Sequence, residues 1–154
     1  MTTIKHCLKN NFLCLQIIDR LHWYAQNGDT IVDFCCGAND FCILMKKKLE
    51  ESGKKCSYKN YDILSTKNDF NFEKRDWMTV RPNELPTGSQ LIMCLSPPFG
   101  TKKALANNFI DKAIELEPKL LIFIVPQEAE RYCLFSCSFF PCMGESTQSL
   151  PRLL

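Results

Sequence analysis

Apolar and polar positions alternate in blocks along the chain, and the blocks predict a succession of helices and strands. The first apolar set recurs at helical spacing, at Leu13, Ile17, Leu21 and Tyr24. This spacing predicts an amphipathic helix over 13–26, ended by the turn residues at 27–29. The β-branched apolar run that follows predicts a buried strand over 30–34.

The same alternation continues to residue 125. It predicts, in order, a helix over 41–52, strands over 55–62, 70–76 and 90–95, a helix over 101–116 and a strand over 119–125. The helix over 101–116 is expected to bury Ala104, Phe109, Ala113 and Ile114 on one face. Strands that are apolar on both faces and alternate with helices indicate a parallel sheet covered on two sides. The predicted fold class is therefore α/β with a mostly parallel sheet.

Length and charge narrow the classes of protein. A chain of 154 residues can bury one core but is short for two, so we expect one domain. Apolar residues make up 45% and charged residues 23%, as in ordinary globular proteins. A net charge of +2 lacks the basic excess of proteins that grip nucleic acid mainly through its phosphates. The composition therefore does not indicate nucleic-acid binding by this chain alone.

The ten cysteines favour a reducing environment. We find no signal peptide, and the longest nearly apolar run, 120–126, is too short to span a bilayer. An intracellular location is then expected, with most cysteines acting as small buried hydrophobic residues. Cys133, Cys137 and Cys142 form a loose cluster without a nearby histidine. Structural zinc needs four well-spaced ligands, so no metal site is expected.

The ends of the first two strands carry candidate ligand-binding residues. In open α/β sheets, ligands bind outside the carboxyl ends of the strands, where the strand order reverses. Asp33 ends the first strand and leads into a loop of small residues that contains Cys35 and Gly37. Asp62 ends the second strand, 25 residues after Gly37. An acidic residue at that distance is typical of one that binds a ribose diol.

The loop after the first strand favours a cationic ligand. It contains neither GxGxxG nor GxxxxGK[ST], which disfavours nicotinamide dinucleotides and nucleoside triphosphates. The carboxylate of Asp33 would repel a pyrophosphate but suits a ligand with an amino acid and a sulfonium. S-adenosylmethionine is such a ligand. Asp76, after the third strand, can accept from an adenine amino group, and Trp77 can cover the base.

The fourth strand leads into candidate catalytic residues, Ser96, Pro97, Pro98 and Phe99. If the strand order reverses beside the first strand, Ser96 lies opposite Asp33. The two prolines stiffen the backbone, and Phe99 can stack on a planar substrate. This combination suits a site that holds an amino or amide nitrogen with its lone pair aimed at a methyl group.

Simpler interpretations compete with these roles. Asp40 fits a helix N-cap, Trp77 fits a core residue, and residues 96–99 fit a proline turn. The three lysines at 46–48 fit a solvated helix face. An unrelated Rossmann-like binder of another nucleoside is a further hypothesis.

Longer strings identify a family. The segments VDFCCGANDF, KKCSYKNYD, NDFNFEKRDWMTV, LPTGSQLIM, SPPFG and LLIFIVP closely resemble the methyltransferase-like domain of plant Enhanced Downy Mildew proteins. The resemblance covers about residues 21–131. It implies a Rossmann-like class I S-adenosylmethionine-dependent methyltransferase fold, with Asp33 and Gly37 near the methionine part, Asp62 at the ribose and Asp76 at the adenine.

The resemblance also implies a setting for the domain. Family members are nuclear, multi-domain chromatin regulators with PHD fingers, so nucleic acid or chromatin protein is the expected substrate or partner. The chain divides accordingly into a divergent segment over 1–20, a methyltransferase-like domain over 21–131 and an atypical tail over 132–154. Because the tail does not match, the sixth and seventh strands of that fold are expected to be missing.

One departure from the family motif leaves two functions open. The family has Asn-Pro-Pro-Phe where this chain has Ser96 before the two prolines. Serine offers one hydroxyl in place of an amide with an acceptor and two donors, although cytosine amino-methyltransferases also use Ser-Pro-Pro-aromatic. The chain is then either a methyltransferase acting on an amino or amide nitrogen, or a catalytically inactive binding or interaction module.

Overall fold

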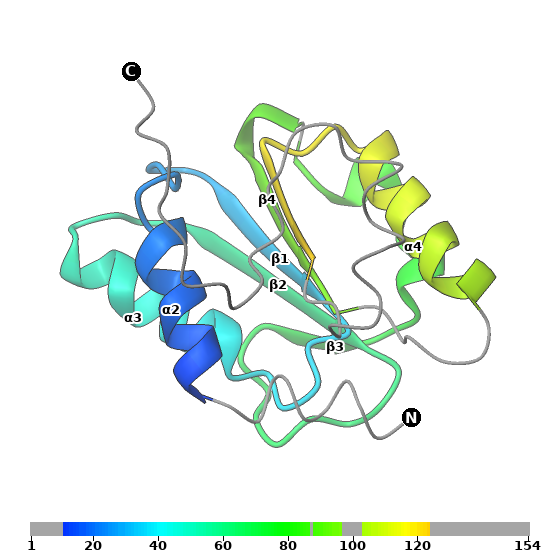
Figure 1. The fold of residues 1–154 in the computed structure, drawn as a ribbon, viewed down its shortest axis with the longest axis horizontal. Coiled ribbons are helices and arrows are strands. Elements are labelled where there is room, and N and C mark those ends of the chain that lie inside the picture. Colours follow the sequence, from blue (N-terminus) through cyan, green and yellow to red (C-terminus); the bar gives the residue numbers. More distant parts are fainter. Residues whose placement is uncertain (1–10, 87, 97–102, 124–154) are drawn as a thin grey trace, which may run out of the picture.

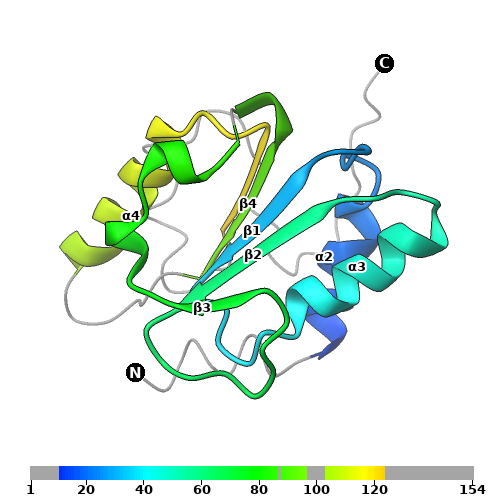
Figure 2. The same cartoon turned by 180° about the vertical axis from the view of Figure 1, so that it is seen from behind.

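The computed structural model describes residues 11–86, 88–96 and 103–123, which form a sheet between two layers of helices and turns. The strands are β1 (Thr30–Phe34), β2 (Ser57–Asp62), β3 (Phe72–Lys74), β4 (Leu91–Leu95) and β5 (Leu120–Phe123). Helices α2 (Asn11–Leu21) and α3 (Phe41–Glu51) cover one face, and α4 (Lys103–Glu115) lies on the other (Figures 1 and 2).

The sheet is parallel throughout, with the order β3-β2-β1-β4-β5. The chain builds outward from β1 to β3 on one side and then crosses back to add β4 and β5 on the other. Asp33 in β1 is the register partner of Asn60 in β2 and of Cys94 in β4. This arrangement confirms the predicted α/β fold with a parallel sheet, and it puts the reversal of strand order between β1 and β4.

Side chains alternate across the sheet and form two cores. Toward α2 and α3, the core includes Ile31, Ile92 and Leu49. Toward α4, the core includes Val32, Phe34, Met93, Leu95 and Phe109. Both faces of β1 and β4 are therefore buried, as their continuous apolar runs predict.

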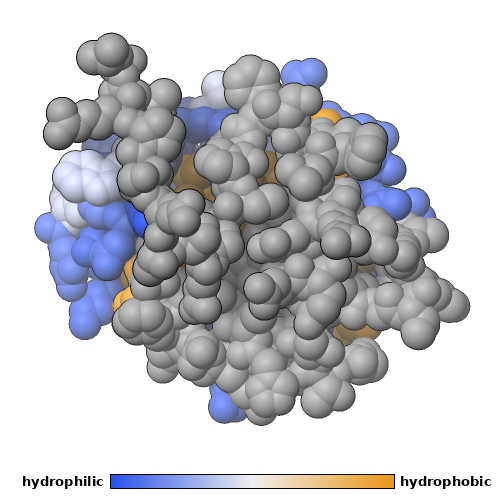
Figure 3. All heavy atoms as spheres, viewed as in Figure 1, coloured by the Kyte–Doolittle hydropathy of each residue, from blue (hydrophilic) through white to orange (hydrophobic). Residues whose placement is uncertain are grey.

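Charged residues cover the outer surfaces of the helices. Lys46 pairs with Glu50 at 3.0 Å, and Lys48 pairs with Asp19 of α2 at 2.6 Å. Figure 3 shows hydrophilic residues at both margins of the molecule, where Figure 1 places α3 and α4. The lysines at 46–48 thus lie on the polar side of α3, whose opposite side buries Phe41, Cys42, Met45 and Leu49.

The first helix is shorter than predicted. It ends at Leu21 rather than at residue 26, and the backbone N–H of Tyr24 donates to the Leu21 carbonyl in a closing turn. Tyr24 is 61% exposed and does not join the buried face. In α4 the face is also shifted, because Ile110 is buried whereas Ile114 is 40% exposed.

Three short 3₁₀ turns replace a crossover helix between β3 and β4. They are η1 (Trp77–Thr79), η2 (Pro82–Glu84) and η3 (Gly88–Gln90). The predicted strand over 70–76 shrinks to three residues because Asp76 caps η1. Gly88 permits a close backbone approach: a Cβ there would lie 1.9 Å from the Glu117 carbonyl oxygen, and the Lys119 N–H donates to the Gly88 carbonyl at 2.7 Å.

Several predictions fall outside the described residues. These are the cysteine cluster at 133–142, the end of the last strand at 124–125, the boundary at 131 and the missing sixth and seventh strands. Across 11–86, 88–96 and 103–123, no group of three or more His, Cys, Asp or Glu side chains is placed to hold a metal ion. None of the helices in those ranges is long and apolar enough to cross a membrane.

Candidate cofactor pocket at the carboxyl ends of the strands

Asp33 is a buried acid at the end of the central strand. Its side chain is 2% exposed, and its Oδ2 has no hydrogen-bond partner among the described residues. Burial, reinforced by the negative charge of Asp62, raises the pKa of the Asp33 carboxyl to about 8. Among the described residues, no cation lowers this pKa, so the carboxyl is mostly protonated at neutral pH.

Ser96 lies next to Asp33 at the reversal of strand order. The Ser96 N–H donates to the Phe34 carbonyl at 3.3 Å and extends the β1–β4 pairing beyond Leu95. Since Cys94 is the register partner of Asp33, Ser96, two residues further on, lies on the same face of the sheet as Asp33. Ser96 is 1% exposed, and its Oγ likewise has no partner among the described residues. The structure thus puts both residues at the same end and on the same face of the sheet, although Cys94 and not Ser96 lies directly opposite Asp33.

The loop after β1 has an unusual backbone. Cys35, Gly37 and Asn39 have φ values of 63°, 58° and 61°, so every second residue is left-handed. Glycine adopts this conformation freely, but Cys35 and Asn39 do so at a cost. The loop is held by the Cys36 N–H, which donates to the Tyr61 carbonyl at 3.1 Å. It ends at Asp40, which occupies the N-cap position of α3 without a side-chain capping bond.

Asp62 ties this loop to the end of β2. Its Oδ2 accepts from the Gly37 N–H and its Oδ1 from the Leu64 N–H, both at 2.9 Å. An ionised carboxylate offers about four acceptor positions, so two remain for a ligand. The 25-residue separation seen in the sequence thus corresponds to a direct contact between Gly37 and Asp62.

Three asparagines hold the loops after β1 and β2 together. Asn39 donates to the Asn68 Oδ1 at 2.8 Å, and Asn68 donates back to the carbonyls of Ala38 and Asn39 at 3.0 and 3.1 Å. The side chains of Asn39 and Asn60 both donate to the Phe70 carbonyl, at 3.0 and 2.7 Å. This asparagine clasp (Asn39, Asn60 and Asn68) fixes the loops that flank the candidate site, and sequence reasoning did not identify it.

Asp76 and Trp77 lie at the third strand end and differ in exposure. Asp76 is exposed and caps η1, with its Oδ1 accepting from the Met78 N–H at 2.9 Å. Trp77 is 2% exposed, its ring centroid lies 3.5 Å from that of Phe34, and its Nε1 donates to the Phe109 carbonyl at 3.5 Å. In this structure the indole belongs to the core and has no free face for a base.

Other apolar side chains are available beside Asp62. Ile63 and Leu64 are 56% and 42% exposed directly after β2. Exposed aliphatic side chains next to an acid at a strand end can cover one face of a flat ring. The signal in the sequence was the Ile-Leu pair immediately after the acidic residue, which the strand-based interpretation overlooked.

The remaining predicted residues contribute in different ways. Burial, together with the surrounding aspartates, raises the pKa of the Cys35 thiol to about 12, and burial raises that of Cys36 as well. Neither thiol is therefore a thiolate nucleophile at neutral pH. Pro97, Pro98 and Phe99 lie outside the described residues. A separate cleft of about 460 Å³ between residues 78–82 and α4 contains none of the predicted site residues.

Comparisons with known proteins give matches over about three quarters of the chain. The family model described as the EDM2 methyltransferase-like domain matches residues 24–139. The protein ENHANCED DOWNY MILDEW 2 of Arabidopsis thaliana is 66% identical over 116 residues, which are 75% of this chain. Those residues span 9% of that relative's own length. No solved structure matches the chain.

Proposed function

The chain belongs to the family of EDM2 methyltransferase-like domains, and from that premise we propose that it binds S-adenosylmethionine at the carboxyl ends of β1, β2 and β3. Asp33 and Gly37 would hold the methionine part, Asp62 the ribose and Asp76 the adenine. When bound, this cofactor supplies an electrophilic methyl group on a sulfonium. The residues of the chain bind and orient it.

The observation that carries the proposal is the buried carboxyl of Asp33, whose Oδ2 has no hydrogen-bond partner among the described residues. Burial keeps this carboxyl mostly neutral, and a cationic ligand beside it would favour the ionised form and pair with it. Asp62 adds a second negative group at the neighbouring strand end, so a pyrophosphate would be repelled. A nucleoside with a positively charged amino-acid tail fits both requirements.

Calorimetric titration of S-adenosylmethionine into the purified chain tests the proposal. We expect saturable binding that Asp33→Asn weakens about tenfold or more, since this change removes a charge-assisted contact. Asp111→Asn is the matched control, because Asp111 lies on α4, on the opposite face of the sheet, and should leave the affinity unchanged. A folded chain that does not bind the cofactor would contradict the proposal.

Methyl transfer to an amino or amide nitrogen is a second, more demanding function. Its support is the unpartnered Ser96 Oγ on the same face as Asp33, which can accept from a target N–H. If Ser96 serves the reaction, Ser96→Asn should raise the rate on nucleic-acid or chromatin-protein substrates without changing cofactor affinity. Cofactor binding without transfer by either protein would support an inactive binding module instead.

We further propose that the domain works in the nucleus within a larger chromatin regulator. The support is family membership alone, and the chain spans 9% of the curated relative that it matches. Imaging of the tagged full-length protein, followed by chromatin fractionation, tests this placement. Exclusion from the nucleus would contradict it.

A further inference from the structure

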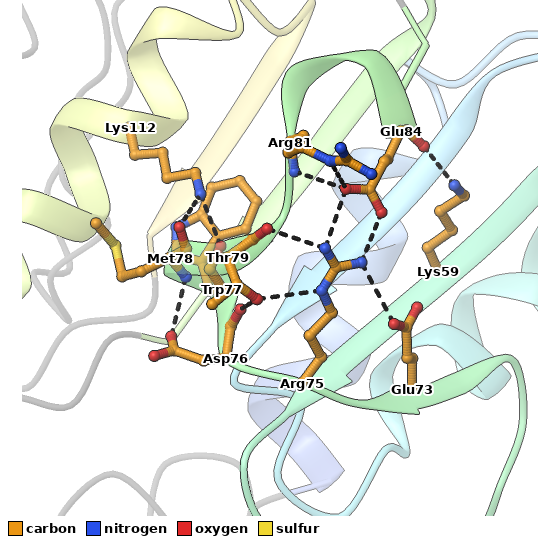
Figure 4. A network of polar contacts seen from close by, with 10 residues as sticks. All are labelled: Lys59, Glu73, Arg75, Asp76, Trp77, Met78, Thr79, Arg81, Glu84 and Lys112. Carbon is orange, nitrogen blue, oxygen red and sulfur yellow. Dashed lines mark hydrogen bonds and ion pairs between the residues drawn. The ribbon is translucent and has the colours of Figure 1, made fainter.

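Arg75 links the end of β2 to the turn that carries Asp76. Its backbone N–H donates to the Asp62 carbonyl at 2.9 Å. Its guanidinium forms two parallel bonds to Glu84, with Nη1 at 2.6 Å from Oε2 and Nη2 at 3.0 Å from Oε1. Nε and Nη2 also reach Thr79, at 3.1 Å to Oγ1 and 2.9 Å to the carbonyl (Figure 4).

Through Thr79, Arg75 holds the turn that begins at Asp76. The Asp76 carbonyl accepts from the Thr79 N–H at 3.0 Å and from its hydroxyl at 2.7 Å. The Asp76 carboxylate accepts from the Met78 N–H and projects away from the guanidinium (Figure 4). Arg75 thus fixes the backbone of the turn, while the carboxylate stays exposed to solvent.

Lys112 of α4 holds the same turn from the other side. Its Nζ donates to the carbonyls of Trp77 and Met78 at 2.9 and 2.7 Å and lies 4.7 Å from the Trp77 ring centroid. With both cations in place, the turn has little freedom to shift relative to the strand ends. The backbone N–H of Arg75 ties the turn to Asp62, and its side chain sets how the turn that carries Asp76 is oriented.

The pair of Arg75 and Glu84 is suited to this role. The Arg75 guanidinium, followed by bonds from Arg81, lowers the pKa of Glu84 to about 2, so the pair stays ionised at physiological pH. The fork geometry of a bidentate pair fixes orientation as well as distance, and lysine cannot reproduce it. The Arg81 side chain constrains the orientation of Glu84 less, because it is 74% exposed and makes one bond to Glu84 at 3.1 Å.

We propose that Arg75 is a positioning residue whose side chain orients the turn that carries Asp76, and through it sets the preference for a purine with a 6-amino group over one with a 6-oxo group. This inference rests on the proposed binding of S-adenosylmethionine. A 6-amino group donates to a carboxylate, whereas a 6-oxo group is an acceptor that a carboxylate repels. The preference therefore depends on how accurately Asp76 meets the ring edge.

The test compares binding of S-adenosylhomocysteine and S-inosylhomocysteine to the purified chain. We expect the natural chain to prefer the adenosyl ligand about tenfold or more, since one charge-assisted hydrogen bond is at stake. Arg75→Lys and Arg75→Gln should reduce this preference to about threefold or less, as should Asp76→Ala. Arg81→Gln is the matched control and should keep the preference.

The outcomes separate the two proposals. If the natural chain binds neither ligand, the proposed function fails. If it binds both ligands equally, or if folded Arg75 variants keep its preference, the positioning role is overturned while cofactor binding stands. Thermal unfolding of each variant checks that the fold is intact. Should both Arg75 variants fail to fold, Glu84→Gln loosens the same fork and is expected to lower the preference in the same direction.

Discussion

At the scale of single residues, the protonation of Asp33 makes the stability of the domain depend on pH. Its folded pKa of about 8 lies well above the unfolded value of about 3.9. Unfolding therefore releases a proton between these values, and stability falls as pH rises from about 4 to about 8, by up to about 1.4 kcal/mol per pH unit. The stability that protonated Asp33 contributes is fully present below about pH 4 and is lost above about pH 8.

Asp33→Asn should remove this slope, because asparagine does not titrate. Urea unfolding of both proteins at several pH values between 5 and 8 measures it. The variant should gain stability relative to the natural chain as pH rises, whereas Asp111→Asn should follow the natural chain. Parallel curves for Asp33→Asn and the natural chain would show that Asp33 is ionised in the fold.

The burial of Trp77 leads to a second prediction about single residues. Trp77→Leu keeps an apolar side chain but removes the ring that packs on Phe34. We expect a loss of stability of about 2–4 kcal/mol, as for other large-to-small changes in a core, with affinity for S-adenosylmethionine within about twofold of the natural value.

Ile63→Ala is the informative counterpart, because Ile63 is 56% exposed beside Asp62. It should weaken cofactor binding while changing stability little. Calorimetric titration and urea unfolding of both variants separate the roles. The opposite pattern, with binding lost in Trp77→Leu alone, would restore the indole as a platform for the base.

At the scale of elements, the asparagine clasp should keep the pocket loops ordered without ligand. Asn68→Ala removes the bonds between Asn68 and residues 38–39 and leaves buried Asn39 without its side-chain acceptor. We expect a cost of about 1–3 kcal/mol and faster amide exchange in residues 37–40 and 63–71. Asn83→Ala, at an exposed position in η2, is the control and should change neither quantity.

Elements with a regular pattern could be predicted from the sequence, and those set by local caps could not. The strand at 30–34 matches its prediction because every position is buried and the flanking turns limit it. In the segment at 70–76, the strand is shorter than its pattern predicts because Asp76 caps a 3₁₀ turn, which competes with continued strand pairing. Similarly, the turn at Tyr24 ends α2 although the apolar spacing continues.

The same distinction applies to the candidate site. That Asp33, Gly37, Asp62 and Ser96 lie at one edge of the sheet could be predicted from their places at strand ends, because parallel strands gather their carboxyl ends there. The clasp could not, since the bonds between Asn68 and residues 38–39 join parts of the chain about 30 positions apart. The sequence pattern likewise allows Trp77 to face either a ligand or the core. Its packing against Phe34 in three dimensions distinguishes the two.

At the scale of the whole molecule, the topology puts all proposed ligand contacts at one end of the sheet. The loops at 34–40 and 62–68 and the turn at 76–79 meet at the carboxyl ends of β1, β2 and β3. The turns at 26–29 and 53–56 precede β1 and β2 and therefore lie at the amino ends of these two strands. A ligand bound as proposed should therefore protect one end of the molecule and leave the other unchanged.

Hydrogen exchange with and without S-adenosylmethionine tests this polarity. At a concentration of 100 times the dissociation constant, binding should add about 2.7 kcal/mol to the free energy of global unfolding. Amides that exchange by local opening should slow in 34–40 and 62–68 but not in 26–29 and 53–56. Asp33→Asn should lose the local effect at concentrations that saturate the natural chain. Equal slowing of amide exchange at both ends of the sheet would point to a site elsewhere. Slowing by a protein partner but not by the cofactor would favour an interaction module.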